Sequence, residues 1–290
     1  MAESKITPPA IVPGELALQG VSKSYGAALF RKEVVRECSF VIERSKLTVM
    51  IGPSGCGKST LIRLLAGFEV PTTGTVTLDG HPIALPDRDR LVVFQETALF
   101  PWMTTWDNIL YGLRARGELT PETREFAEFL LHKVGLQDFR DKYPLQLSGG
   151  MQRRAELARA MVNNPKVMIL DEPFRGLDAM TKELMWEYYS RLFEENRRTN
   201  FFVTTDIDEA VYLADRLLIM SNIPCQVRAV IDIDLPRPRR LGDLVESDRA
   251  NDIKKQALSI LHAEAMRSFS RGSKAAADFV QAYLKRARHT

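Results

Sequence analysis

The sequence has 290 residues, of which 45% are hydrophobic and 27% charged, so it can bury the core of one large domain with an appendage. Its formal net charge of +3 argues neither for nor against nucleic acid, because a nucleic-acid footprint needs basic residues clustered on one face. No run approaches the roughly 18 apolar residues of a membrane span, and the start of the chain lacks the apolar core of a signal peptide. We therefore expect a soluble, cytoplasmic protein that reaches a membrane only through a partner.

The three cysteines, Cys38, Cys56 and Cys225, are isolated from one another in the sequence. They form no CxxC pair and no even-numbered framework, so neither a zinc site nor a disulfide scaffold is indicated. A reducing compartment is the default for such a chain.

The first segment, residues 1–14, carries three prolines and little periodicity, which predicts a disordered lead-in. Residues 15–19 and 38–43 have the pattern of strands that flank a loop and a short insert. Tyr25 falls in that loop, where an aromatic ring could stack on a nucleotide base. An exposed tyrosine in a loop more often has no such role.

Residues 47–67 are organised as a short apolar strand, a glycine-rich turn and an amphipathic helix. The turn at residues 52–59 fits G-x-x-x-x-G-K-[ST], in which glycines let consecutive N–H groups point at phosphate oxygens. Lys58 is placed to reach the β- and γ-phosphates, and the hydroxyl of Ser59 to hold Mg²⁺. Cys56 occupies a variable position of the pattern. The stretch is interpreted as a phosphate cradle.

After this helix, residues 71–83 alternate in the manner of a hairpin with Asp79-Gly80 at its turn. Residues 91–94 indicate a buried strand that places Gln95 where ligands lie in parallel sheets. The following segment gathers four large apolar residues, which suggests a docking surface or a contribution to the core: Leu99, Phe100, Pro101 and Trp102.

Residues 120–134 predict a helix with Thr120 as N-cap, Pro121 in first position and Gly135 as terminator. A second glycine-rich helix start follows at Ser148-Gly149-Gly150, suited to another anion contact. Residues 167–170 then predict a buried strand that ends in two carboxylates. Of these, Asp171 can hold Mg²⁺ and Glu172 can polarise an attacking water.

Taken together, these motifs make residues 15–234 resemble the ATP-binding subunit of an ABC transporter. The resemblance covers the base-stacking aromatic, the Walker A loop, the Q-loop glutamine, the signature, Walker B and the D-loop, found here at Tyr25, 52–60, Gln95, 147–152, 167–172 and 176–178. Within the family, three stretches resemble importers of nitrate, sulfonates, taurine and related anions: 95–109, 171–185 and 206–220.

The resemblance implies an α/β fold, namely a P-loop nucleotide-binding domain with an antiparallel β subdomain, a helical subdomain and a C-terminal helical extension. The implied domains are a lead-in at 1–14, a cassette at 15–235 and a linker with helical extension at 236–290. The implied nucleotide contacts are Tyr25, Gly52, Pro53, Ser54, Gly55, Cys56, Gly57, Lys58, Ser59, Thr60, Ser148, Gly149, Gly150 and Asp178. The implied Mg²⁺ ligands are Ser59, Gln95 and Asp171, and the implied catalytic residues are Glu172, Gln95 and Thr205.

The resemblance also implies partners. Two cassettes would sandwich each ATP between the P-loop of one and the signature of the other. They would drive two membrane subunits, docked near residues 99–102 at the cytoplasmic face of the cell membrane, with a solute-binding protein delivering the substrate and no nucleic acid involved.

Two positions depart from the family pattern. The D-loop, usually built from small residues before Leu-Asp, here has Arg175-Gly176. Thr205 occupies the position of the family's switch histidine, and its hydroxyl is shorter than an imidazole and cannot become cationic. This leaves open a weakly hydrolysing, ATP-gated regulatory module. A cassette for DNA repair is disfavoured, because residues 60–147 show no sustained heptads.

The tail opens with a basic run, PRPRR at 236–240, for which a solvated linker is favoured over contact with lipid headgroups or nucleic acid. Two helices are predicted after it, at 250–269 and 274–287. We expect them to pack on the cassette or on its dimer partner.

Overall fold

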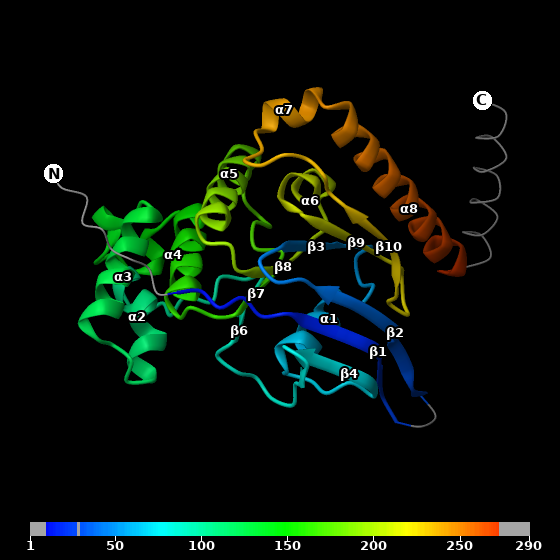
Figure 1. Cartoon of the computed structure of the whole chain (residues 1–290), viewed down its shortest axis with the longest axis horizontal. Coiled ribbons are helices and arrows are strands. Elements are labelled where there is room, and N and C mark those ends of the chain that lie inside the picture. Colours follow the sequence, from blue (N-terminus) through cyan, green and yellow to red (C-terminus); the bar gives the residue numbers. More distant parts are fainter. Residues whose placement is uncertain (1–9, 28–29, 273–290) are drawn as a thin grey trace.

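The computed structural model describes residues 10–27 and 30–272. They form three layers: a small antiparallel sheet with helix α1, a central sheet, and a set of helices on the far side of that sheet (Figure 1). Two separate hydrophobic cores lie between these layers, one on each face of the central sheet.

The antiparallel sheet has the strand order β2-β1-β4-β5. Its strands are β1 (Leu16–Tyr25), β2 (Lys32–Ile42), β4 (Thr73–Leu78) and β5 (His81–Pro82). The predicted hairpin is confirmed, because Asp79 and Gly80 connect β4 to β5 with φ of 51° and 79°, as a two-residue turn of type I′ requires.

The central sheet has the order β10-β9-β3-β8-β7-β6, and every pairing except β10 with β9 is parallel. Its strands are β3 (Leu47–Ile51), β6 (Arg90–Val93), β7 (Val167–Asp171), β8 (Thr199–Thr204), β9 (Arg216–Met220) and β10 (Val227–Asp232). Covered on both faces, β3 and β8 are buried along their whole length. Alternate side chains enter opposite cores, with Met50 on the side of α1 (Lys58–Ala66) and Val49 on the other.

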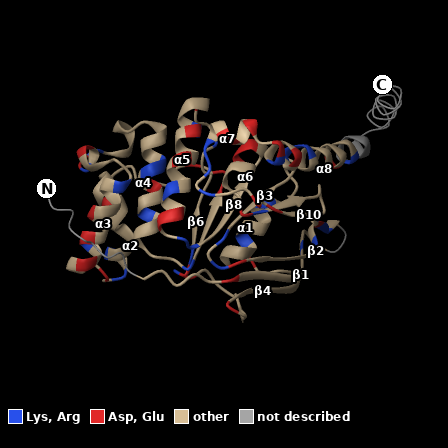
Figure 2. Cartoon of the chain, turned by 45° about the horizontal axis from the view of Figure 1, so that its top comes forward, with Lys and Arg blue, Asp and Glu red and all other residues tan. Residues whose placement is uncertain are grey.

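The helices on the other face of the central sheet enclose the second hydrophobic core. They are α2 (Thr105–Ala115), α3 (Pro121–Lys133), α4 (Gly149–Val162), α5 (Ala179–Glu195), α6 (Ile207–Leu213), α7 (Leu241–Glu246) and α8 (Asp248–Gly272), with short 3₁₀ turns at Gln137–Phe139 and Pro144–Gln146. The predicted start of α3 is confirmed, since Thr120 caps the helix and Pro121 is its first residue. Acidic and basic residues are interleaved over these helices (Figure 2).

Three expectations about strands were wrong in extent. β1 continues through the residues expected to form a loop, so Tyr25 ends a strand, and β2 begins within the expected insert at Lys32. Register shifts at Val21 and Lys23 let β1 remain paired with β2 although its apolar alternation is interrupted. The strand expected at 91–94 ends at Val93, and Phe94 is half exposed.

The expectation of a disordered lead-in up to residue 14 was also wrong at its end, while residues 1–9 lie outside the described part. Gly14 is buried, and its carbonyl accepts a hydrogen bond of 2.6 Å from the Thr199 hydroxyl of β8. The chain is therefore hydrogen-bonded to the central sheet before β1 begins.

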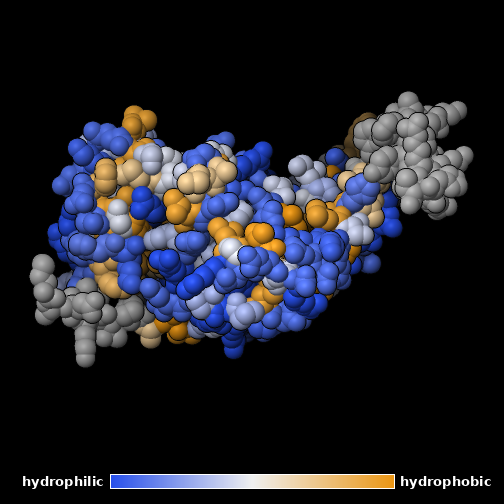
Figure 3. All heavy atoms as spheres, turned by 90° about the horizontal axis from the view of Figure 1, so that it is seen from above, coloured by the Kyte–Doolittle hydropathy of each residue, from blue (hydrophilic) through white to orange (hydrophobic). Residues whose placement is uncertain are grey.

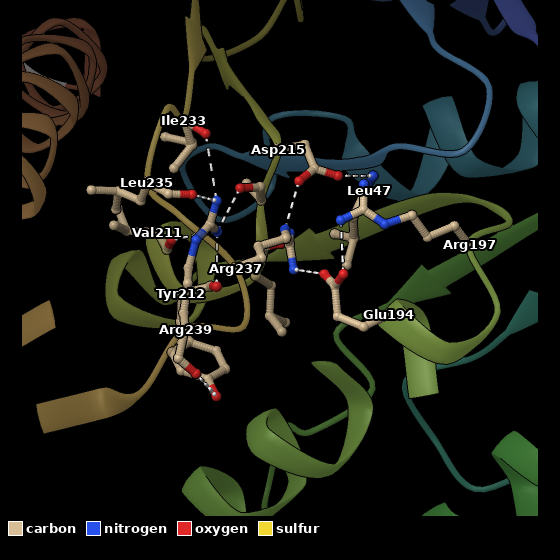
Figure 4. Close-up of polar contacts among 12 residues, drawn as sticks. Leu47, Glu194, Arg197, Val211, Tyr212, Asp215, Ile233, Leu235, Arg237 and Arg239 are labelled. Carbon is tan, nitrogen blue, oxygen red and sulfur yellow. Dashed lines mark hydrogen bonds and ion pairs between the residues drawn. The ribbon is translucent and has the colours of Figure 1, made fainter. Parts of the chain in front are cut away.

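The expectation that PRPRR forms a solvated linker was wrong, because Arg237 and Arg239 are buried against α6 (Figure 4). Arg239 donates to the carbonyl oxygens of Val211, Tyr212 and Ala214 at 3.2, 2.9 and 2.7 Å. Arg237 pairs with Asp215 at 2.7 Å and Glu194 at 3.1 Å and also donates to the Leu213 carbonyl. We call residues 236–240 the arginine strap.

The first predicted tail helix is confirmed as part of α8, and the second lies outside the described residues. Ala250, Ile253 and Ala257 of α8 join the same core as the helices around α6. Buried Glu264 accepts from the backbone N–H of Asn222 at 3.2 Å and pairs with Arg228 of β10 at 2.9 Å. The described part of the C-terminal extension is therefore continuous with the packing of the cassette.

Candidate active site

The glycine-rich turn connects β3 to α1 and lines an open cleft of about 320 Å³. Gly55 and Gly57 have φ of 74° and 115°, a region that residues with a side chain rarely adopt. A Cβ atom at Gly57 would also lie 3.1 Å from Val34 and 3.2 Å from Cys225. Both glycines are therefore required by the turn, which leads into the start of the nine-residue α1, where N–H groups favour an anion.

Lys58 lies in this turn with only 7% of its surface exposed. Its ammonium group donates to the carbonyl oxygens of Gly52 and Pro53 at 2.9 and 3.1 Å. These are neutral acceptors, so an anion that enters the cleft can replace them with a stronger partner.

The carboxyl ends of two other parallel strands complete the cleft. Besides Ser54, Gly55, Gly57, Lys58, Ser59 and Thr60 of the turn, its lining contains Gln95, Glu172, Val34 and Arg175. Gln95 follows β6 and Glu172 follows β7, which neighbour each other in the sheet. Residues far apart in the sequence thus meet at one edge of the sheet.

Glu172 is held in an uncommon backbone conformation. Its φ is 42°, its N–H donates to the carbonyl of Val203 on β8 at 2.9 Å, and the residue is 9% exposed. Non-glycine residues with positive φ cluster at functional sites, where the surrounding structure fixes them. Here β8 fixes Glu172 so that its side chain faces the cleft.

Asp171 is the last residue of β7 and is half-buried. Burial, followed by the neighbouring Glu172 carboxylate, raises the pKa of Asp171 to about 6, against the opposing charge of Lys58. Asp171 is not among the residues that line the cleft, although it directly precedes Glu172, which lines it.

Two other predicted residues, Tyr25 and Cys56, lie beside the cleft. Tyr25 sits next to the turn, with its hydroxyl 2.6 Å from Glu69 and 3.5 Å from Thr60, and Lys23 lies over its ring. Cys56 is fully buried behind the turn next to Cys225, whose hydrogen bond lowers the pKa of Cys56 below its usual value.

Thr205 follows β8 but is exposed and is not part of the cleft lining. Among the described residues its hydroxyl has no hydrogen-bond partner, whereas the preceding Thr204 is buried and accepts from Asp206. The position expected to sense phosphate is therefore uncharged and outside the cleft.

The second glycine-rich helix start lies elsewhere on the chain. Ser148 caps α4 by accepting from the Met151 N–H at 3.3 Å, and a Cβ atom at Gly150 would lie 2.9 Å from Thr181 of α5. Ser148 and Gly150 line a different cleft, while Gly149 packs near Leu177 and Asp178 caps α5. Within a single chain, the start of α4 therefore does not reach the glycine-rich turn at residues 52–59.

Sequence reasoning missed a link between α4 and the segment after β6. Arg153 donates to the carbonyl of Phe94 at 2.9 Å and to that of Gln95, and it pairs with Glu156 at 2.6 Å. Glu156 in turn accepts from the Ala98 N–H at 2.8 Å. Two charged residues on the buried face of a predicted helix were the available signal.

The predicted apolar segment divides. Leu99 is buried in the core, whereas Trp102 is 70% exposed and Pro101 is exposed. Phe100 packs between Trp102 and Tyr111 of α2 with tilted rings, whose centroids are 5.5 and 4.5 Å away. The core interpretation therefore holds for Leu99. We call Phe100, Trp102 and Tyr111 the aromatic surface.

Comparison with known proteins decides the family. The family model described as ABC transporter matches residues 35–175. An ABC transporter ATP-binding protein of Methanocaldococcus jannaschii is 42% identical over 79% of this chain and 84% of its own length. The chain belongs to the ABC transporter family of ATP-binding proteins.

Other members of the family are similarly close. The nitrate import ATP-binding protein NrtD of Synechococcus elongatus is 41% identical over 86% of this chain and 92% of the relative. The aliphatic sulfonates import ATP-binding protein SsuB of Bacillus cereus is 38% identical over 77% and 88%.

A solved structure agrees with this assignment. A dimeric ATP-binding cassette in a post-hydrolysis state, bound to ADP and Pi, matches with a TM-score of 0.65 and 27% identity, covering 76% of this chain and 100% of that one. This chain is therefore an ABC-type ATPase with the α/β fold of that family. Among residues 10–27 and 30–272, no helix has the length and apolarity needed to cross a membrane.

Proposed function

We propose that this protein is the ATP-hydrolysing subunit of an importer of small anions, such as nitrate, sulfonates or taurine. The observation that carries the proposal is the cleft in which Lys58, Ser59, Gln95 and Glu172 meet at one edge of the central sheet. Relatives named for nitrate and sulfonate import support the transport class. The cassette does not touch the transported solute in this proposal, so its residues do not select among these anions.

In the first step, ATP enters the cleft with its phosphates against the N–H groups of residues 54–60. Lys58 exchanges its two carbonyl partners for the β- and γ-phosphates. Tyr25 lies beside Thr60, where its half-exposed ring is available to the base.

Ser59 and Gln95 line the cleft and Asp171 ends β7 directly before Glu172, so their oxygen donors fit Mg²⁺, which prefers oxygen ligands. When bound, this ion neutralises charge that develops on the phosphate oxygens. Glu172 orients the attacking water and accepts its proton.

The separate location of Ser148 and Gly150 supports a dimer. In the proposed assembly, the start of α4 from a second cassette closes over the phosphates bound in the first. Because Arg153 ties α4 to the backbone of Gln95, closure would also move the segment that precedes Trp102. This connects ATP binding to membrane subunits docked on the aromatic surface at the cytoplasmic face of the membrane, to which a solute-binding protein delivers substrate.

The test is Glu172→Gln in the full-length protein. An amide of the same shape cannot accept the proton, so we expect ATP binding to persist, hydrolysis to stop and ATP-bound dimers to accumulate. Light scattering coupled to gel filtration measures the dimer, and phosphate release measures turnover. Continued hydrolysis without an ATP-dependent dimer would remove Glu172 from the proposed role.

The transport class is tested separately. The cassette is purified with the permease and solute-binding protein encoded beside its gene, and ATP-dependent uptake of labelled nitrate, sulfonate and taurine is measured in proteoliposomes. Uptake of none of these anions, with uptake of a cation or a sugar, would contradict the anion class.

A further inference from the structure

Arg175 lies in the candidate active site although the family pattern expects a small residue there. It follows Glu172 by three residues and precedes Gly176, whose φ is 81°. Its Nη1 atom donates to Oε2 of Glu172 at 3.2 Å, and its side chain lines the same cleft as Lys58.

The cleft presents a charge problem that Arg175 can solve. ATP brings several negative charges next to the carboxyl groups of Glu172 and Asp171. Neighbouring charges of the same sign repel strongly where water is partly excluded. Among the described residues that line the cleft, Lys58 and Arg175 are the cations. Lys58 is fixed at the base of the turn, whereas Arg175 stands on the side of Glu172.

The geometry leaves Arg175 available to a phosphate. A guanidinium offers five N–H donors in a planar fork, and here only Nη1 has a partner among the described residues. The Arg175 side chain is 61% exposed although its partner Glu172 is buried, so its remaining N–H groups face solvent. One edge of the fork can therefore remain on the Glu172 carboxylate while the other binds a phosphate oxygen.

We infer that Arg175 binds the terminal phosphate of ATP while it stays beside Glu172. Thr205 is uncharged and lies outside the cleft, so Arg175 is the cation that, besides Lys58, distinguishes ATP from ADP in this cleft. The inference rests on the proposed function, since it takes the cleft to be the ATP site.

The test compares affinities for a non-hydrolysable ATP analogue and for ADP in the full-length chain. We expect Arg175→Met to lower the preference for the ATP analogue by about tenfold or more, through weaker binding of the analogue and unchanged binding of ADP. Arg175→Lys keeps the charge and should retain part of the preference.

A matched control is Arg197→Met. Arg197 also pairs with a glutamate three residues before it, Glu194, at 2.7 Å, but on the opposite end of α5 and away from the cleft. We expect its nucleotide preference to equal that of the parent. Melting curves of all variants report whether the fold is intact.

Lys58→Ala separates failure of this inference from failure of the proposed function. If Lys58→Ala abolishes binding of both nucleotides while Arg175→Met leaves their ratio unchanged, Arg175 is a surface ion pair and the inference is wrong. If Lys58→Ala leaves both affinities unchanged, the cleft is not the ATP site and both proposals fall.

Discussion

At the scale of single residues, the active site combines backbone that only certain residues tolerate with charges that lack complete partners. Gly55, Gly57 and Glu172 all have positive φ, and Lys58 rests on two neutral carbonyl groups. The surrounding strands hold this backbone and these incompletely neutralised charges in place. An anion that binds in the cleft then supplies the missing charged partner. Function therefore depends on residues that contribute little to the stability of the free protein.

Thr205 is the residue at which the chain breaks its family's pattern. One donor to developing oxyanion charge typically contributes about 10²–10³ in rate. We expect Thr205→His, which adds a longer donor at this position, to raise steady-state phosphate release by the reconstituted transporter at saturating ATP. Thr205→Ala should match the parent, because the threonine hydroxyl lies outside the cleft, and Glu172→Gln gives the background rate. If the histidine variant shows no gain, the position is a bystander.

Glu209 provides a pH-dependent test of stability. It lies on α6, accepts from the Trp186 indole at 2.6 Å, and faces Lys182 of α5, Thr204 of β8 and Asp206. Burial raises the pKa of Glu209 to about 7 from 4.5, against the opposing hydrogen bond from Thr204 and the charge of Lys182. Protonated Glu209 therefore contributes to the free energy of unfolding, fully below pH 4.5, and this contribution is lost as pH rises through about 7.

Glu209→Gln removes this dependence because the amide never ionises. We expect the variant to gain stability over the parent as pH rises from 5 to 8, by up to roughly 3 kcal/mol, in urea unfolding. The exposed Glu183→Gln on α5 is the control. If the unfolding free energies of the variant and the parent differ by the same amount at pH 5 and at pH 8, Glu209 does not have the raised pKa.

At the scale of elements, the arginine strap closes the end of α6. The last turn of a helix leaves carbonyl groups without internal partners, and the Arg239 guanidinium supplies donors to three of them. Arg237 neutralises Asp215, which also accepts from the Leu47 N–H at the start of β3. A segment with the composition of a linker is thereby fixed to the central sheet.

We expect Arg239→Met to destabilise the protein by about 3 kcal/mol or more, because buried carbonyl groups lose their donors. Hydrogen exchange should show faster opening of residues 207–213 and of α8. Arg240→Met, a substitution at the exposed neighbouring position, is the control. Equal melting temperatures for both variants would show that the strap is not needed.

At the scale of the whole molecule, the face viewed from above carries hydrophobic groups in separate small patches among hydrophilic residues (Figure 3). The aromatic surface of Phe100, Trp102 and Tyr111 brings three rings into contact, and two of them are exposed. A cluster of exposed aromatic rings favours burial against another protein.

We expect Trp102→Asp to reduce co-purification of the cassette with its membrane subunits by tenfold or more, while the melting temperature of the isolated cassette stays unchanged. Val245→Asp on α7 is the control, since Val245 is also 70% exposed. Normal co-purification of the Trp102 variant would place docking elsewhere.

The sequence by itself determined the parts of this protein whose structure is local. The glycines of the turn at 52–59, the Asp79-Gly80 hairpin and the capped start of α3 were predictable, because backbone conformation and capping depend on neighbouring residues. The order of motifs also placed Gln95 and Glu172 at the ends of parallel strands, so their meeting at one sheet edge followed from the fold class.

Only the tertiary structure decided which charges are buried and which pair. Arg239 reads as solvated in sequence, but its partners are carbonyl groups on α6, 25 to 28 positions earlier in the chain. Arg175 reads as a departure from a pattern, yet its place beside Glu172 brings it into the cleft with Lys58. Local periodicity reports which face of an element is apolar, whereas the pairing of long polar side chains depends on distant backbone that the fold brings close.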